Sequence, residues 1–192
     1  ETDELNQSGP RFDDQPPMIR MRVDPEETLP VALPSGLAAP SVDIVIPVHN
    51  EWQVLRPCLE SVEAFTQYPN ARVVILDDGS DAFVKERIER WAAGPRRLPV
   101  EVKRNEVALG FVQNANRGFR ETDGDLVALL NSDTVVTPAW LVRLVNAIAS
   151  DPRIACVMPM SNQCSFHSLD VPMGWNIFQY SADLGRRMQR TC

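Results

Sequence analysis

The sequence has 192 residues, of which 44% are hydrophobic and 23% are charged, so it is long enough and apolar enough to form one domain with a buried core. Its net charge of −7 is unevenly distributed, because residues 1–40 hold three Arg against eight Asp and Glu, a balance of −5, and the rest carries −2. A nearly neutral body behind an acidic arm lacks the basic face needed for sequence-independent nucleic-acid binding.

Residues 1–40 contain seven of the sixteen prolines and show no sustained hydrophobic periodicity. Because proline fixes φ and lacks an N–H, this acidic stretch is predicted to be an extended linker or arm. No basic leader followed by an apolar run is visible, and no apolar run approaches the ~20 residues needed to cross a bilayer. The sequence begins at Glu1, so we interpret it as a piece of a longer protein.

From Ser41 onward, strand-like apolar runs alternate with segments that have helical apolar spacing. In chain order we expect a strand at 42–46, a helix at 51–67, a strand at 72–76, a helix at 81–93, a strand at 99–103, a helix at 111–121, a strand at 126–130, a helix at 137–150 and a strand at 154–158. The first strand is expected to end at Pro47, and Gly124 should lie just past the third helix. Thr137 and Pro138 are expected to start the fourth helix.

Such an alternation predicts a mostly parallel α/β sheet flanked by helices, with right-handed crossovers. Polar clusters follow three of the predicted strands, at residues 47–51, 77–80 and 131–134. In parallel sheets ligands bind beyond the carboxyl ends of the strands. The three clusters are therefore expected to form one ligand site.

The pattern excludes several kinds of site. The four cysteines are scattered without a CxxC pair and there are two histidines, so neither a zinc site nor a disulfide framework is expected, and the thiols should be free. Neither GxGxxG nor GxxxxGK[ST] occurs, which argues against a nicotinamide dehydrogenase and a P-loop enzyme. Without a basic phosphate cradle, a divalent cation held by Asp133 is a plausible way to neutralise a diphosphate.

Four motifs in order resemble family 2 glycosyltransferases: IVIPVHNE at 44–51, VILDDGS at 74–80, Asn105 with GFVQNANRG at 110–118, and Gly124-Asp125 with LNSDT at 130–134. They cover residues 41 to about 150. The segment 159–162, with Trp175 and Asn176 further on, is similar to the subset that builds bacterial surface polysaccharides.

The resemblance implies an α/β fold of the GT-A type, a Rossmann-like, mostly parallel sheet that is apparently truncated here. It implies inverting transfer of a sugar from a nucleoside-diphosphate sugar to a glycan or lipid-linked acceptor. The nucleotide expected before any other is UDP or dTDP. The expected cofactor is Mn²⁺ or Mg²⁺. The expected location is the cytoplasm, with peripheral attachment at the inner face of the membrane.

The resemblance also assigns the site. Asp78 resembles the carboxylate that accepts the N3 hydrogen of uracil or thymine. Asp133 matches the last acidic residue of the DxD motif and would contact the metal, whereas Asn131 occupies the first position, on the donor-sugar side. The remaining nucleotide-binding residues are Pro47, Val48, His49, Glu51, Asn116 and Arg117.

The general base stays unassigned, because no matching acidic motif appears between Met160 and Cys192. We therefore expect a nucleotide-binding domain at residues 41–160 and an incomplete acceptor-side segment at 161–192. An unfinished sheet exposes an open edge, so we also expect either a homo-oligomer or a missing C-terminal half.

Other interpretations remain open at this level. The clusters at 77–80 and 131–134 could be turns that cap helices, His49 could pack at the sheet edge, and Asn116 with Arg117 could be a solvated helix face. A non-catalytic nucleotide-binding or interaction module on the same scaffold is a second function. A nucleotidyltransferase would need a Gly/Arg/Lys loop after the first strand, and residues 47–51 are not one.

Overall fold

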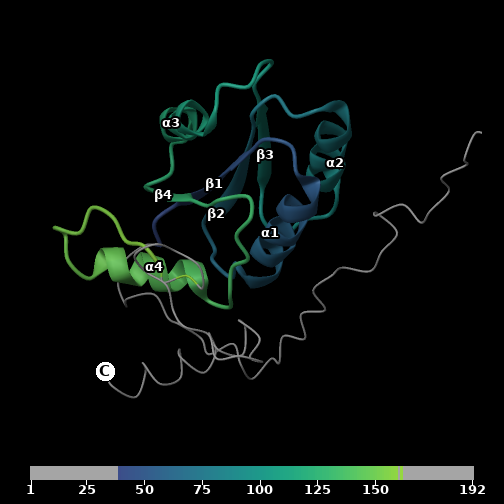
Figure 1. Cartoon of the computed structure of the whole chain (residues 1–192). Helices are drawn as coiled ribbons and strands as arrows, with labels where there is room; N and C mark the ends of the chain where they lie inside the picture. The colour runs from purple at the N-terminus through teal and green to yellow at the C-terminus, as the bar shows by residue number, and fades with distance from the viewer. Residues whose placement is uncertain (1–38, 160, 162–192) are drawn as a thin grey trace, which may run out of the picture.

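The computed structural model describes residues 39–159 and residue 161 (Figure 1). Strands and helices alternate as the sequence predicts. In chain order they are β1 (Val42–Val48), α1 (Trp52–Phe65), β2 (Ala71–Asp77), α2 (Ala82–Ala93), β3 (Val100–Arg104), α3 (Phe111–Glu121), β4 (Leu126–Leu129) and α4 (Trp140–Ala149). The predicted arm, apart from residues 39 and 40, and nearly all of the predicted segment 161–192 lie outside the described residues.

The four strands form one parallel sheet in the order β3-β2-β1-β4. From β1 the chain adds β2 and then β3 on one side, and it then returns to add β4 on the other side of β1. The sheet therefore changes its direction of growth between β1 and β4, which makes the carboxyl ends of these two strands the topological switch point.

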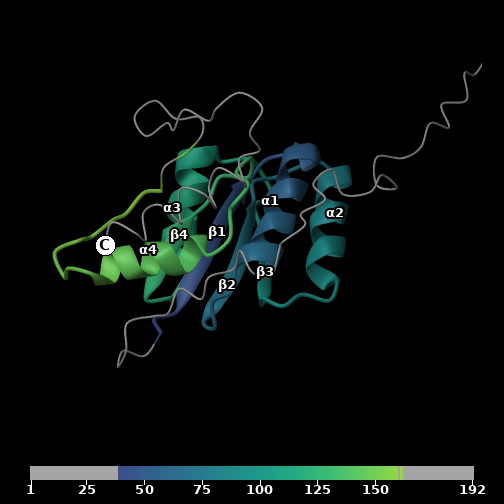
Figure 2. The ribbon, with the colours of Figure 1, turned by 90° about the horizontal axis from the view of Figure 1, so that it is seen from below.

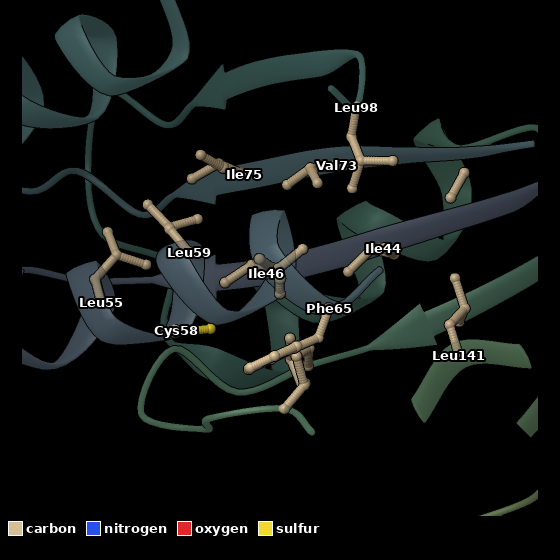
Figure 3. Close-up of a cluster of buried hydrophobic side chains, with 14 of the residues drawn as sticks. Ile44, Ile46, Leu55, Cys58, Leu59, Phe65, Val73, Ile75, Leu98 and Leu141 are labelled. Carbon is tan, nitrogen blue, oxygen red and sulfur yellow. The ribbon is translucent and has the colours of Figure 1, made fainter. Parts of the chain in front are cut away.

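Helices cover both faces of the sheet. The larger core joins the face carrying Ile44 and Ile46 to α1, α2 and α4, and α1 and α2 lie side by side (Figure 2). Figure 3 shows part of this core, with Leu55, Cys58 and Leu59 directed from α1. The opposite face has a much smaller apolar cluster, consisting of Val45, Val74 and Leu76 with the partly buried Val127.

Helix α3 packs against the small cluster and approaches the sheet closely at Gly118. A Cβ at this position would lie 2.7 Å from both Leu76 Cδ1 and Val45 Cγ1. Any larger side chain here would push α3 away from β1 and β2, so the absence of a side chain permits the tight contact.

Strand β1 continues through Pro47 instead of ending before it. The carbonyl of Val45 accepts the Leu130 N–H on the β4 side, and the carbonyl of Val48 accepts the Asp78 N–H on the β2 side. Successive residues of a strand direct their backbone N and C=O groups to opposite neighbouring strands, so the nitrogen of Pro47 faces the β4 side. On that side the pairing of β4 with β1 has already ended at Leu129. Proline costs no ladder hydrogen bond at this point.

Two further boundary predictions are wrong. Helix α4 begins at Trp140 after Ala139, which has a positive φ of 61°, because residues 137–140 form a turn closed by the Trp140 N–H to the Thr137 carbonyl. Gly124 does not cap α3, which ends at Glu121 with an extended Thr122. The Gly124 N–H instead donates to Asp43 Oδ2.

The predicted fifth strand at 154–158 is also not formed within the described residues. Ala155, Cys156 and Met158 are exposed there, so the apolar run that predicted a buried strand has no sheet to pack on in this part of the chain. No helix among the described residues is both long enough and apolar enough to span a membrane.

A buried carboxylate, Asp43, joins β1 to β2 and to the segment before β4 at the amino end of the sheet. It is 2% exposed and pairs with the Arg72 guanidinium at 2.5 and 3.0 Å. Its Oδ2 also accepts the N–H groups of Asp123 and Gly124, at 3.1 and 2.9 Å. Burial alone would raise the pKa of Asp43, but the hydrogen bonds and charge of Arg72 and the two N–H groups outweigh it and lower the pKa.

Substitution of Asp43 by Ala should lower the free energy of unfolding in urea by about 2–3 kcal/mol, because hydrogen bonds to a charged group are lost and their donors remain. Asp123 also bonds Arg72, but its side chain is 90% exposed. Asp123→Ala should therefore change the stability by only about 0.5 kcal/mol. Equal effects of the two variants would contradict the assigned role of Asp43.

Candidate functional site

A pocket of about 330 Å³ lies at the switch point between β1 and β4. One wall comes from the end of β1 and the first turn of α1, and the other from the loop after β4; Phe111, the first residue of α3, completes it. The lining residues are Pro47, Glu51, Val54, Phe111, Asn131, Ser132 and Asp133. This volume is in the range of small-molecule sites.

The β1 side of the pocket has a distinctive backbone. Asn50 and Glu51 both adopt left-handed conformations, with φ of 58° and 56°, which L-residues other than Asn and Asp rarely do. The Asn50 N–H donates to Ser80 Oγ, and Asn50 Oδ1 accepts the Asp81 N–H. These bonds join the cluster after β1 to the cluster after β2 and direct Glu51 into the pocket wall.

His49 is exposed, and its Nδ1 lies 2.7 Å from the backbone carbonyl oxygen of Asp78. A carbonyl oxygen only accepts hydrogen bonds, so Nδ1 carries the proton in this contact. His49 therefore connects the end of β1 to the end of β2, while Val48 is buried within the sheet.

The lining of the pocket is acidic. It contains the carboxylates of Glu51 and Asp133 and no Lys or Arg. The Asp133 carboxylate makes no hydrogen bond or ion pair within the described part of the chain, and Asp133 is exposed. A phosphate group alone would be repelled here, and a cation between it and these carboxylates would offset that repulsion.

The β4 side of the pocket is a turn held against α1. The Thr134 N–H donates to the Asn131 carbonyl, and the thiol of Cys58 lies 3.6 Å from the same carbonyl oxygen. Burial, with the nearby Asp133 charge, raises the pKa of Cys58 to about 12. The thiol therefore stays protonated at neutral pH, and within the described chain both Cys58 and Cys156 are free.

Asp78 does not line the pocket but lies buried, 3% exposed, at the end of β2. Its Oδ1 accepts the Asn105 amide and the Leu109 N–H at 2.7 and 2.8 Å, and its Oδ2 accepts the Gly110 N–H at 2.8 Å. Burial alone would raise its pKa, but these bonds and the nearby His49 outweigh burial and lower the pKa. The carboxylate fixes the loop that leads into α3.

A buried amide network extends from Asp78 into α3. Asn105 also donates to Asn114 Oδ1, and Asn114 donates to the Leu76 carbonyl at 2.9 Å. Arg117 donates to Asn105 Oδ1 at 2.5 Å and to Glu121. Arg117 is thus two contacts away from Asp78, whereas Asn116 is exposed on α3.

The structure brings together Pro47, Glu51, Asn131 and Asp133 in one lining. Val48, His49 and Asp78 lie beside it at the ends of β1 and β2, and Asn116 and Arg117 lie on α3 outside the lining. Sequence reasoning missed Phe111 and Val54 as lining residues. Val54 is 38% exposed, and its position three residues after Glu51, one helical turn on, was the available signal.

The donor set suits a metal that is shared with a ligand. Among the described residues no group of three His, Cys, Asp or Glu side chains could hold an ion. Mg²⁺, however, is commonly bound by one or two carboxylates together with substrate phosphates. Asp133, an exposed carboxylate with open acceptor positions, fits that arrangement.

The chain is similar in sequence to known proteins. Residues 43–189 match the model of the family described as Glycosyl transferase family 2, more than half of the chain. An N-acetylglucosaminyltransferase of Mesorhizobium japonicum is 36% identical over 115 residues, 58% of this chain and 26% of that protein. A dolichol-phosphate mannosyltransferase of Pyrococcus furiosus is 27% identical over 114 residues, 59% of this chain and 32% of that protein. The chain thus spans about a quarter to a third of these relatives.

Solved structures share the fold. The mannosyltransferase PcManGT of Pyrobaculum calidifontis, in complex with GDP-Man and Mn²⁺, aligns with a TM-score of 0.55 and 23% identity over 60% of this chain and 34% of that chain. S. aureus TarS, in complex with UDP-GlcNAc, aligns with a TM-score of 0.51 and 19% identity, over 57% of this chain and 31% of that chain. The expected GT-A-type parallel sheet flanked by helices is confirmed.

The pKa direction of Asp78 predicts an acid-sensitive fold. A carboxylate with a lowered folded-state pKa contributes stability above its ordinary pKa of 3.8, and this contribution is lost as pH falls through the lower folded value. The free energy of unfolding of the wild-type chain should therefore decrease as pH falls below about 4. In Asp78→Asn that decrease should be smaller and stability at pH 7 lower, as measured by urea denaturation at each pH; an identical pH profile would contradict this role.

Proposed function

This chain belongs to glycosyl transferase family 2, and from that premise we propose that it forms the nucleotide-sugar-binding half of an inverting, metal-dependent glycosyltransferase. The observation that carries the proposal is the acidic pocket at the switch point, which gathers Pro47, Glu51, Asn131 and Asp133. Parallel sheets bind ligands at this kind of position. Electrostatics then favour entry of a diphosphate into this acidic lining together with a cation.

The base is proposed to lie against Pro47, Val48 and His49, with Asp78 as its hydrogen-bond acceptor. An ionised carboxylate has about four acceptor positions, and the protein uses three at Asp78. One position on Oδ2 is left. Uracil and thymine present a single ring N–H, whereas guanine presents two adjacent donors. This count supports UDP or dTDP as the nucleotide. Asn116 and Arg117 are proposed to approach the nucleotide from α3.

The metal is proposed to be Mn²⁺ or Mg²⁺, held by Asp133 and by the diphosphate of the ligand. PcManGT, a protein of similar fold, was solved with GDP-Man and Mn²⁺. When bound, the cation would neutralise charge on the departing diphosphate. Asn131, two residues before Asp133, faces the donor sugar in this proposal, and Glu51 bounds the nucleotide from the other wall.

The acceptor hydroxyl is proposed to belong to a glycan or a lipid-linked sugar in cytoplasmic polysaccharide synthesis. Relatives named N-acetylglucosaminyltransferase and dolichol-phosphate mannosyltransferase support sugar transfer of this general kind. In an inverting reaction an Asp or Glu takes the proton of that hydroxyl. No described residue is assigned to this step.

A second function, a non-catalytic interaction module on the same scaffold, is favoured by one observation. The described residues contain no group of three ligands that would hold a metal by itself. An interaction module of this kind would bind neither nucleotide nor a metal–nucleotide complex, so the absence of both in the experiments below would favour it.

Calorimetry should show that UDP or dTDP binds the chain more tightly with Mn²⁺ than without. Asp133→Ala should weaken binding in Mn²⁺ by about a hundredfold, because a close charge pair near the surface contributes a few kcal/mol. Asp123→Ala is the matched control, since this exposed aspartate precedes β4 whereas Asp133 follows it, at the other end of the strand. Absence of nucleotide binding in the wild type, or equal weakening in both variants, would refute the proposal.

The acceptor count at Asp78 predicts the choice of base. With Mn²⁺ present, UDP should bind about tenfold more tightly than GDP, because one guanine donor would stay unpaired at a cost of about 1.5 kcal/mol. Competitive calorimetry with UDP, dTDP and GDP measures this ratio. Tighter binding of GDP would show that another group reads the base.

A further inference from the structure

The loop that carries Asp133 is tied to helix α1 by two buried side chains. The loop leaves β4 at Leu129 and reaches the buried Val136, which is 6% exposed. Cys58 and Ser61 lie three residues apart on α1, hence on one face of the helix, and both are 0% exposed. Neither residue lines the pocket.

Cys58 contacts the loop before Asp133. Its Sγ lies 3.6 Å from the carbonyl oxygen of Asn131, within the range of a thiol hydrogen bond. The same carbonyl accepts the Thr134 N–H at 3.1 Å, which closes the turn around Asp133. Cys58 therefore holds the first residue of that turn against α1, and Figure 3 shows its sulfur directed away from the helix into the core.

Ser61 contacts the loop after Asp133. Its Oγ accepts the Val136 N–H at 3.0 Å and donates to the Cys58 carbonyl at 2.8 Å. Both ends of the hydroxyl are thus used, and the Val136 N–H would have no acceptor here without it. A buried donor left unsatisfied costs about 1–3 kcal/mol, so this contact resists displacement of the loop.

The two contacts flank Asp133, two residues before it and three residues after it. Asp133 itself is exposed, and its carboxylate makes no hydrogen bond that would orient it in the described part of the chain. Its position is therefore set by the backbone, and the backbone is set by α1. We propose that Cys58 and Ser61 are positioning residues that place the Asp133 carboxylate for the metal–nucleotide complex, an inference that rests on the proposed function.

This role differs from that of an ordinary packing contact, and a third contact in the same segment provides the comparison. Thr66, just after α1 and 2% exposed, accepts the Trp140 Nε1–H at 3.0 Å through its hydroxyl. Like Ser61, it joins the α1 region to the segment after β4 through a buried hydroxyl. It reaches the start of α4, seven residues beyond Asp133, and does not flank the turn.

The test compares Ser61→Ala with Thr66→Val, each of which removes one buried hydroxyl. Calorimetry measures UDP affinity with and without Mn²⁺, and the ratio of the two values is the metal enhancement. Groups that orient a metal ligand typically change metal affinity by about 10–100-fold. Ser61→Ala should lower the metal enhancement by about this factor and leave the metal-free affinity within about twofold, whereas Thr66→Val should leave the enhancement unchanged. Both variants should lose thermal stability.

A wild-type enhancement that persists in Ser61→Ala would overturn the inference and leave the proposed function standing. An equal fall of the enhancement in Thr66→Val would also overturn it, because the effect would then be a general loss of structure. If the wild-type chain shows no metal enhancement, the proposed function fails and the inference fails with it. Should Ser61→Ala not fold, Cys58→Ala provides the same comparison at the other contact, with the same two deciding outcomes.

Discussion

Helix α3 is held at both ends by buried aspartates, and the arrangement of the sheet depends on this. Asp78 accepts the Leu109 and Gly110 N–H groups just before the helix, and Asp43 accepts the Asp123 and Gly124 N–H groups just after it. The face that α3 covers has only a small apolar cluster. Charge-assisted hydrogen bonds to backbone groups are stronger than neutral ones, so the two carboxylates supply attachment that the small apolar cluster does not.

The position of α3 has a direct consequence for the site. Because α3 crosses the sheet on this face, the chain returns to the free edge of β1 and adds β4 there. The loops after β1 and β4 then meet at one rim and form the pocket. Asp78 lies outside the pocket lining. Its carboxylate accepts the N–H groups of Leu109 and Gly110, the two residues before Phe111. The contacts that stabilise the fold therefore also define the shape of the candidate site.

Much of the site was predictable, because its residues follow strands that periodicity identifies. Asn131 and Asp133 follow an apolar run, as do Pro47 and Glu51, and parallel strands bring such residues to one rim. The residues that support them were harder to predict. Ser61 and Cys58 lie on the apolar face of a helix, where the sequence pattern does not distinguish a small residue that bonds a loop from one that only fills the core. Their partners are more than seventy positions away in the sequence.

The sequence by itself determined the alternation of strands and helices, the rim to which the polar clusters belong, and the family, since each of these depends on local periodicity or on contiguous motifs. Only the tertiary structure decided that Asp78 is used by the protein's own loop, that Val54 and Phe111 face the pocket, and that the run at 154–158 forms no strand within the described residues. The physical reason is that hydrogen-bond partners and burial are properties of three-dimensional neighbours. An aspartate at a strand end has the same local sequence pattern whether a ligand or a backbone N–H occupies its oxygens.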